Sequence, residues 1–222
     1  MLAVFIILIS LLLSNINSYN VSMLGIDIAR VSIESRNISN NDKESVQKIV
    51  YRSSTKSVAD IFFPVSNYHE TVINGSNILQ YKKDINQTDY KEKSGTYRRN
   101  DTTFYSLDKF VCKDCHNIFS LLNLAQQNPY SVLNNEFIID REGETFKANF
   151  ILKSKINNIL TLWLNIDLVS SQNYIIRKND IFLWGIFLPN CERLISIDLN
   201  SNKIVKCQFN NRLINLEANL LE

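Results

Sequence analysis

Two cysteines and a histidine near the middle of the chain have a spacing that could support chemistry. Cys112, Cys115 and His116 fit C-x-x-C-H, the attachment pattern of c-type haem. In such a site the two thiols bond to the haem vinyl groups and the histidine binds the iron. A second axial ligand would be Met or His, and after removal of a signal peptide the candidates are Met23 and His69. Haem c binding is therefore one hypothesis.

The same residues fit two other roles. A Cys112–Cys115 disulfide would close a very short loop and would add little stability. A reactive dithiol would need a thiol pKa lowered by the start of a helix and by His116. The usual setting of such a dithiol is a βαβ unit, which this sequence does not show. We favour a structural role for the cysteines, with haem attachment and a redox dithiol as alternatives.

The remaining chemistry-bearing residues define no second site. Cys191 and Cys207 complete an even set of four cysteines, which allows three disulfide connectivities. Cys207 lies on an apolar strand face, where it is either paired or buried. The chain has only 2 His and contains no G-x-S-x-G, H-E-x-x-H or P-loop motif. We therefore assign no catalytic residue, and we expect no metal because zinc binding by thiols is disfavoured in an oxidising compartment.

The N-terminus predicts an exported protein. Residues 2–13 form a nearly continuous apolar run, which suits a signal peptide and is short for a membrane span. We predict a signal peptide at 1–18, with cleavage before Tyr19, and a single β-rich domain at 19–222. An uncleaved anchor is the alternative. After cleavage no stable transmembrane span remains, and the expected location is periplasmic or extracellular.

Composition narrows the class of partner. The chain has 222 residues, 45% of them hydrophobic, which is ordinary for a globular protein with a sizeable core. Its formal net charge is only +2, so there is no electrostatic reason to expect nucleic acid as a partner.

Strand signals dominate the first half of the chain. Residues 19–35 read as one long strand with a bulge or bend, because the apolar phase changes after Gly25 and again near Ile28. Residues 46–65 read as two strands or as one long bent strand. Asn74-Gly75 lies between two strand-like runs and predicts a hairpin with a type I′ turn.

One helix interrupts the strands, and apolar runs follow it. Residues 116–126 have apolar side chains at helical spacing, and Asp114 could cap their start. This helix should pack on or plug the sheet. The runs at 160–168 and 181–188 predict buried strands, which place Trp163 and Trp184 as candidates to face a ligand, although such residues more often belong to the core.

These elements predict a mainly β fold: a curved antiparallel sheet, or a partly closed β-barrel, with one short helix at about 116–126. Closure would remove exposed strand edges. It would also create an apolar interior that is either packed solid or open to a ligand.

Several segments resemble exported bacterial proteins of the family catalogued as domain of unknown function 3108. The opening segment YNVSMLGIDIA is similar to that family's opening, IFFPV to its apolar-Pro-Val segment, and IFLWGIFLPNCERLISIDL to its late Trp-containing strand. The matching residues are Tyr19, Val21, Ser22, Gly25, Ile26, Ile28, Phe63, Pro64, Val65, Trp184 and Arg193. The resemblance implies an exported, mainly β protein with no established activity, and it supplies no catalytic residue.

The sequence thus favours an exported, non-enzymatic β protein. It would act as a scaffold among envelope proteins or as a binder of an apolar or lipid-like ligand, an inference by analogy with the fold. The alternative is a redox protein that uses Cys112, Cys115 and His116.

Overall fold

The computed structural model describes residues 15–39, 45–75, 77–100, 102–105, 108–111, 115–141, 144–171, 180–212 and 215–221. The strands of the first half are β1 (Asn15–Met23), β2 (Ile26–Ser39), β3 (Ser45–Thr55), β4 (Ser66–Asn74), β5 (Asn77–Gln87), β6 (Tyr90–Arg99), β7 (Thr102–Tyr105) and β8 (Asp108–Val111). Those of the second half are β9 (Glu136–Arg141), β10 (Glu144–Ile156), β11 (Ile159–Ser171), β12 (Glu192–Asp198), β13 (Lys203–Asn210) and β14 (Asn215–Leu220). The helices are α2 (Ser57–Phe62), α3 (Ile118–Gln127) and α4 (Ile181–Ile186).

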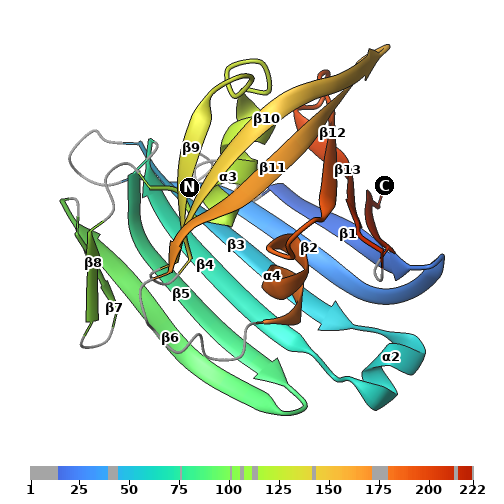
Figure 1. Ribbon diagram of the computed structural model, residues 1–222. Helices are drawn as coiled ribbons and strands as arrows, with labels where there is room; N and C mark the ends of the chain where they lie inside the picture. Colours follow the sequence, from blue (N-terminus) through green and yellow to red (C-terminus); the bar gives the residue numbers. More distant parts are fainter. Residues whose placement is uncertain are drawn as a thin grey trace, which may run out of the picture.

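All these strands belong to one 14-stranded antiparallel sheet. From β1 to β8 each strand pairs with the next, and the same holds from β9 to β14. The pairing of β1 with β14 joins the two series, so β8 and β9 are the edges of an open sheet. The sheet curls until β9–β13 rise across β1–β6 (Figure 1). The predicted curved, partly closed sheet is confirmed.

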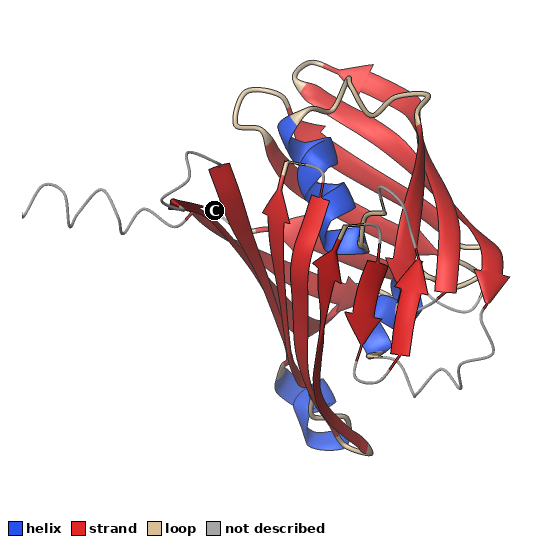
Figure 2. Cartoon of the chain, turned by 90° about the vertical axis from the view of Figure 1, so that its left-hand side faces the viewer, coloured by secondary structure: helices blue, strands red, loops and turns tan. Residues whose placement is uncertain are grey.

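The helix α3 fills the space between the two walls of this sheet, as Figure 2 shows. Its side chains at Ile118, Leu121 and Ala125 are buried, as its apolar spacing predicted. Asn117, and not the predicted Asp114, is its N-cap: the Asn117 side chain accepts from the Ser120 amide, and Ser120 returns a bond to the cap. Asp114 itself lies outside the described residues. The predicted plug is therefore confirmed, with a different cap.

The interior of the curled sheet is the hydrophobic core. One cluster of buried residues extends from Tyr19 on β1 through α3 to Ile204 on β13. Alternate residues of β10 contribute Phe146, Ala148 and Phe150 to it, in agreement with the predicted period of two. α3 thus supplies the apolar contacts that hold the two walls together.

The first predicted strand is two strands. Leu24 and Gly25 both have positive φ, 52° and 81°, and these two residues form the turn between β1 and β2. Two-residue hairpin loops often have positive φ at both loop residues. The second change in apolar phase, near Ile28, is a β-bulge, because Val21 pairs with Ala29 while Ser22 pairs with Asp27. The prediction of one continuous strand was wrong because a hairpin and a bend both shift the apolar phase.

Two other apolar segments were also misassigned. The predicted strand region 46–65 is β3 followed by α2, a helix in which no residue is buried. The predicted strand run 181–188 contains α4. A short run that is apolar on every side carries no period that separates a strand from a helix.

The hairpin prediction at Asn74-Gly75 holds with a shift of one residue. Asn74 pairs with Asn77 as the last pair of β4 and β5, so the loop begins at Gly75, whose φ is +58°. β1 begins at Asn15, inside the predicted signal peptide, while residues 1–14 lie outside the described part of the chain. The cleavage site stays a prediction. No described helix has the length and apolar content needed to cross a membrane.

Candidate functional site

An apolar cavity of about 130 Å³ lies inside the curled sheet. It is lined by side chains from β1–β4, β13 and β14, together with Phe119 and Leu122 of α3 and Leu183 and Ile186 of α4. Most of its wall is hydrocarbon, and His69 and Asp180 are among its few polar residues. The two helices therefore complete a cavity that the sheet alone would leave open.

Two tyrosines contribute aromatic surface to the cavity wall. The Tyr19 hydroxyl donates to the Ile204 carbonyl at 2.9 Å, which ties β1 to β13. The Tyr51 ring packs against Phe119 with 4.4 Å between ring centroids. Burial raises the pKa of both phenols, and nearby Cys207 adds to the effect. Both tyrosine side chains are therefore uncharged parts of the cavity wall.

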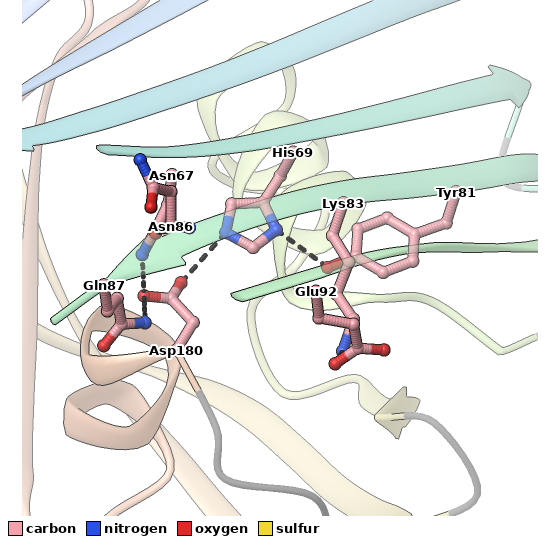
Figure 3. Close-up of polar contacts among 8 residues, drawn as sticks. All are labelled: Asn67, His69, Tyr81, Lys83, Asn86, Gln87, Glu92 and Asp180. Carbon is pink, nitrogen blue, oxygen red and sulfur yellow. Dashed lines mark hydrogen bonds and ion pairs between the residues drawn. The ribbon is translucent and has the colours of Figure 1, made fainter. Parts of the chain in front are cut away.

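A histidine–aspartate pair forms the polar corner of the cavity (Figure 3). His69 of β4 is 3% exposed and Asp180, immediately before α4, is 4% exposed. The His69 Nε2 atom lies 2.9 Å from Asp180 Oδ2, and its Nδ1 atom lies 2.8 Å from the Tyr81 hydroxyl on β5. With Nε2–H donating to the carboxylate, Nδ1 accepts from Tyr81.

Amide side chains hold the other oxygen of this carboxylate. Asn67 donates to Asp180 Oδ1, and Gln87 Nε2 lies 3.5 Å from the same atom. Asn67 is itself oriented by the Asn86 amide, which donates to its Oδ1 at 3.1 Å. These contacts join the start of α4 to β4 and β5, so they position the part of the cavity wall that α4 supplies.

A smaller cavity of about 50 Å³ adjoins the apolar one, since both share Phe119, Asp180 and Leu183. Its wall is more polar and includes Lys83 of β5. The Lys83 ammonium lies 3.2 Å from the Glu92 carboxylate on β6. The interior thus changes from apolar to polar across the Asp180 corner.

The described end of the C-x-x-C-H motif, Cys115 and His116, lies just before α3, and Cys115 lines the smaller cavity together with Asp180. Cys112 is outside the described residues, and Cys115 is buried and disulfide-bonded. The His116 backbone bonds to Ile138 and Asp140 at 2.8 Å each and so covers the β9 edge. The His116 ring is buried, with Nδ1 3.4 Å from Ser120 Oγ.

The second predicted haem ligand is already engaged. Both ring nitrogens of His69 have hydrogen-bond partners, so iron coordination would require one of these bonds to break. Met23, the other candidate, lies at the end of β1 and is 40% exposed. Haem attachment remains a prediction from the motif.

Cys191 and Cys207 are free thiols, so neither candidate forms a disulfide, and of the two alternatives for Cys207 the unpaired one holds. Cys207 pairs with Ile195, four residues along the chain from Cys191. That separation is about 13 Å in a strand, well beyond the span of a disulfide. Burial raises the pKa of the Cys207 thiol to about 12, so this cavity-lining cysteine is chemically inert near neutral pH.

The two tryptophans proposed as ligand-facing candidates have different outcomes. Trp163 lies between the buried Leu162 and Leu164 on β11, so it points to the opposite face, where Lys153 Nζ is 4.8 Å from its ring. It does not face the cavity. Trp184 lies on α4 instead of a strand, and its side chain is outside the described part of the structure.

Sequence reasoning missed Asp180 and Tyr81. No local pattern marks either residue, because their partner His69 is 111 residues from Asp180 along the chain. Among the described residues, no group of three or more His, Cys, Asp or Glu side chains is placed to hold a metal ion.

The fold and the cavity define a class: an open, barrel-like antiparallel β protein around an apolar interior. A crystal structure of a β-barrel-like protein of domain of unknown function DUF1849 from Brucella abortus is similar, with a TM-score of 0.55 over 93% of this chain and 95% of that chain. The two sequences are 6% identical, so the likeness shows the fold alone. No protein-family model matches this sequence, and no curated protein matches it. The comparisons thus support a β-barrel-like fold of unknown function and not family 3108 specifically.

Proposed function

We propose that the protein is exported and non-enzymatic, and that it binds an apolar, lipid-like group inside its curled sheet. The observation that carries this proposal is the cavity of about 130 Å³ between the sheet, α3 and α4. A core packed solid would leave no such space. Export is supported by the N-terminal apolar run.

The size of the cavity limits the ligand. An apolar cavity of about 150 Å³ stays dry and admits benzene, whereas sites for drug-sized ligands run from roughly 300 Å³. A cavity of about 130 Å³ therefore suits one short apolar group, such as the end of an acyl chain. The rest of such a ligand would lie outside this cavity.

The buried polar groups nearest the cavity support a structural role. His69, Asp180 and Tyr81 bond to one another, and the carboxylate is further held by Asn67. Such a network fixes α4 against the sheet and keeps the cavity wall in place. We accordingly assign these residues to the architecture of the site and not to catalysis.

Gly185 of α4 offers a way to test the cavity without disturbing its frame. A Cβ atom at Gly185 would meet only Leu216 Cδ1, at 3.6 Å, which is an ordinary contact. Leucine at this position would occupy the cavity, whereas alanine would add one methyl group. We expect Gly185→Leu to weaken binding of a fluorescent fatty-acid analogue at least 10-fold, with Gly185→Ala close to wild type.

Ala218→Leu fills the same cavity from β14 and serves as a second variant if the helix tolerates leucine poorly. Circular dichroism and urea unfolding would establish that each variant is folded. Saturable binding that both leucine variants weaken would support the proposal. No binding by the wild type, or equal binding by folded leucine variants, would reject it.

A further inference from the structure

The short helix α2 lies beside β2 but exposes most of its apolar side chains. It contains no buried residue, and it carries Val58, Ile61 and Phe62, which are 64%, 76% and 65% exposed. Phe63, directly after the helix, is 67% exposed. These large side chains make no contribution to the core.

The turn between β1 and β2 extends this exposed apolar surface. The Lys56 amide donates to the Ile28 carbonyl at 2.9 Å, which holds the start of α2 beside β2. Leu24 and Ile26 are 76% and 68% exposed. Figure 1 shows α2 and this turn projecting at the same end of the sheet. The apolar tip is defined as Met23, Leu24, Ile26, Val58, Ile61, Phe62 and Phe63.

Folding alone does not account for the apolar tip. A helix of six residues is marginal in water, and most helical stability in proteins comes from packing of an apolar face. Here that face meets solvent. Scattered exposed apolar residues are ordinary, but a contiguous apolar patch on a projecting element marks an interaction site.

A polar groove with an excess of positive charge adjoins the apolar tip. It has a volume of about 860 Å³, and its wall includes Ser54 and Ser66, which flank the α2 segment in sequence. Its charged lining residues are the basic Arg30, Arg52, Lys91 and Lys93 and the acidic Asp84 and Glu92. Lys93 pairs with Asp84 at 2.8 Å and Arg52 pairs with Glu34 at 3.2 Å. Arg30 and Lys91 therefore carry the excess positive charge, which favours a negatively charged surface beside the tip.

The apolar tip is also close to the proposed binding cavity. Val21 lines the cavity and lies two residues before Met23 of the tip. Met23 pairs with Leu216, which lines the cavity as well. The end of the sheet that carries the tip is therefore the end toward which the cavity extends along β1.

We propose that the apolar tip inserts into the surface of a bilayer that contains anionic lipids, with the basic groove facing the headgroups. A projecting apolar surface flanked by cations is the combination that binds such interfaces, through buried apolar area and attraction to anionic lipid. The inference does not depend on ligand binding in the cavity.

Vesicle flotation tests the proposal. The full chain would be mixed with vesicles of phosphatidylcholine alone and with vesicles that contain about one third phosphatidylglycerol. The tip variant is Phe62→Ser with Phe63→Ser. Its matched control is Leu168→Ser with Val169→Ser on β11, where the side chains are 57% and 52% exposed. The N-terminal apolar run is present in every variant, so the difference between variants reports on the tip.

We expect the tip variant to bind anionic vesicles at least 10-fold less than wild type and the control to bind as wild type does. Arg30→Ser with Lys91→Ser should weaken binding to anionic vesicles and leave binding to neutral vesicles unchanged. Because α2 has no buried residue, the tip variant should fold and should still bind the fluorescent fatty-acid analogue.

Two results would overturn the proposal. One is equal vesicle binding by the tip variant and its control. The other is a wild-type dimer that the tip variant converts to a monomer in size-exclusion chromatography with light scattering, which would assign the apolar tip to a second copy of this chain.

Discussion

Two neighbouring residues of β4 stand in two different polar environments. His69 points into the curled sheet and bonds to Asp180 and Tyr81. Glu70 points to the outer face, where Lys48 and Tyr68 contact its carboxylate. Both side chains are buried, at 3% and 7% exposure. The inner contact joins segments 111 residues apart, whereas the outer contacts join β4 to its neighbour β3.

The inner and outer clusters show two different structural roles for buried polar side chains. The outer cluster reinforces strand pairing that backbone hydrogen bonds already fix. Burial alone would raise the pKa of Glu70, but hydrogen bonds from Lys48 and Tyr68 lower it overall. The inner cluster positions the start of α4, whose other end is held by Arg193 of β12 through the Ile186 carbonyl. Loss of the inner contact should therefore change both stability and the cavity, and loss of the outer contact should change stability only.

The largest effect is expected for Asp180→Ala. It leaves His69 and Asn67 facing a buried gap and releases the start of α4 from the sheet. Each buried donor left without its acceptor costs about 2 kcal/mol, so loss of the acceptor of both His69 and Asn67 should lower the free energy of unfolding in urea by about 4 kcal/mol. Binding of the fluorescent fatty-acid analogue should weaken as well, because α4 forms part of the cavity wall.

Asp167→Ala is the matched control for that prediction. Asp167 lies on β11 with an exposed side chain. Exposed substitutions of this kind change stability by about 0.5 kcal/mol or less. If Asp180→Ala and Asp167→Ala unfold at the same urea concentration and bind the analogue equally, the assigned role of Asp180 is wrong.

A smaller loss, about 2 kcal/mol, is expected for Glu70→Gln, which weakens charged hydrogen bonds while keeping the shape of the side chain. Because the folded-state pKa of Glu70 is lowered, its contribution is fully present above its ordinary pKa and is lost as the pH falls through the folded value. Wild-type stability should therefore drop more steeply between pH 6 and pH 3 than that of the variant.

Urea unfolding at a series of pH values measures how steeply the free energy of unfolding changes with pH. Binding of the fatty-acid analogue would be measured in parallel at pH 7. Analogue binding should be unchanged in Glu70→Gln. A variant whose stability falls with acid as steeply as wild type, or whose ligand binding falls with its stability, would remove the distinction between the inner and outer clusters.

The sequence predicted the sheet well because strand pairing here is local. Each strand in β1–β8 pairs with the next, so alternation and turn residues were enough to indicate a curled antiparallel sheet. Helix α3 was equally predictable from the sequence, since Ile118, Leu121 and Ala125 have helical spacing. The errors fell on α2 and α4, where short apolar runs carry no period.

The candidate site was far less predictable. The sequence drew attention to Cys112, Cys115 and His116, which form a recognisable local motif. The cavity instead depends on Asp180 meeting His69, a contact created by the curl of the whole sheet and invisible to any local pattern. Trp163 differs, because its orientation could be read from the sequence: Leu160, Leu162 and Leu164 alternate with Thr161, Trp163 and Asn165, and the leucines are the buried set.

The smallest effect separates the two bonds of the His69 ring. Tyr81→Phe removes the hydroxyl that lies 2.8 Å from Nδ1 and leaves the bond from Nε2 to Asp180 intact. The net worth of one neutral hydrogen bond is about 1 kcal/mol, so urea unfolding should show a loss near that value. Analogue binding should persist, because α4 remains tied through Asp180. A Tyr81→Phe variant that loses stability and analogue binding as fully as Asp180→Ala would show that the carboxylate does not position the helix without the tyrosine.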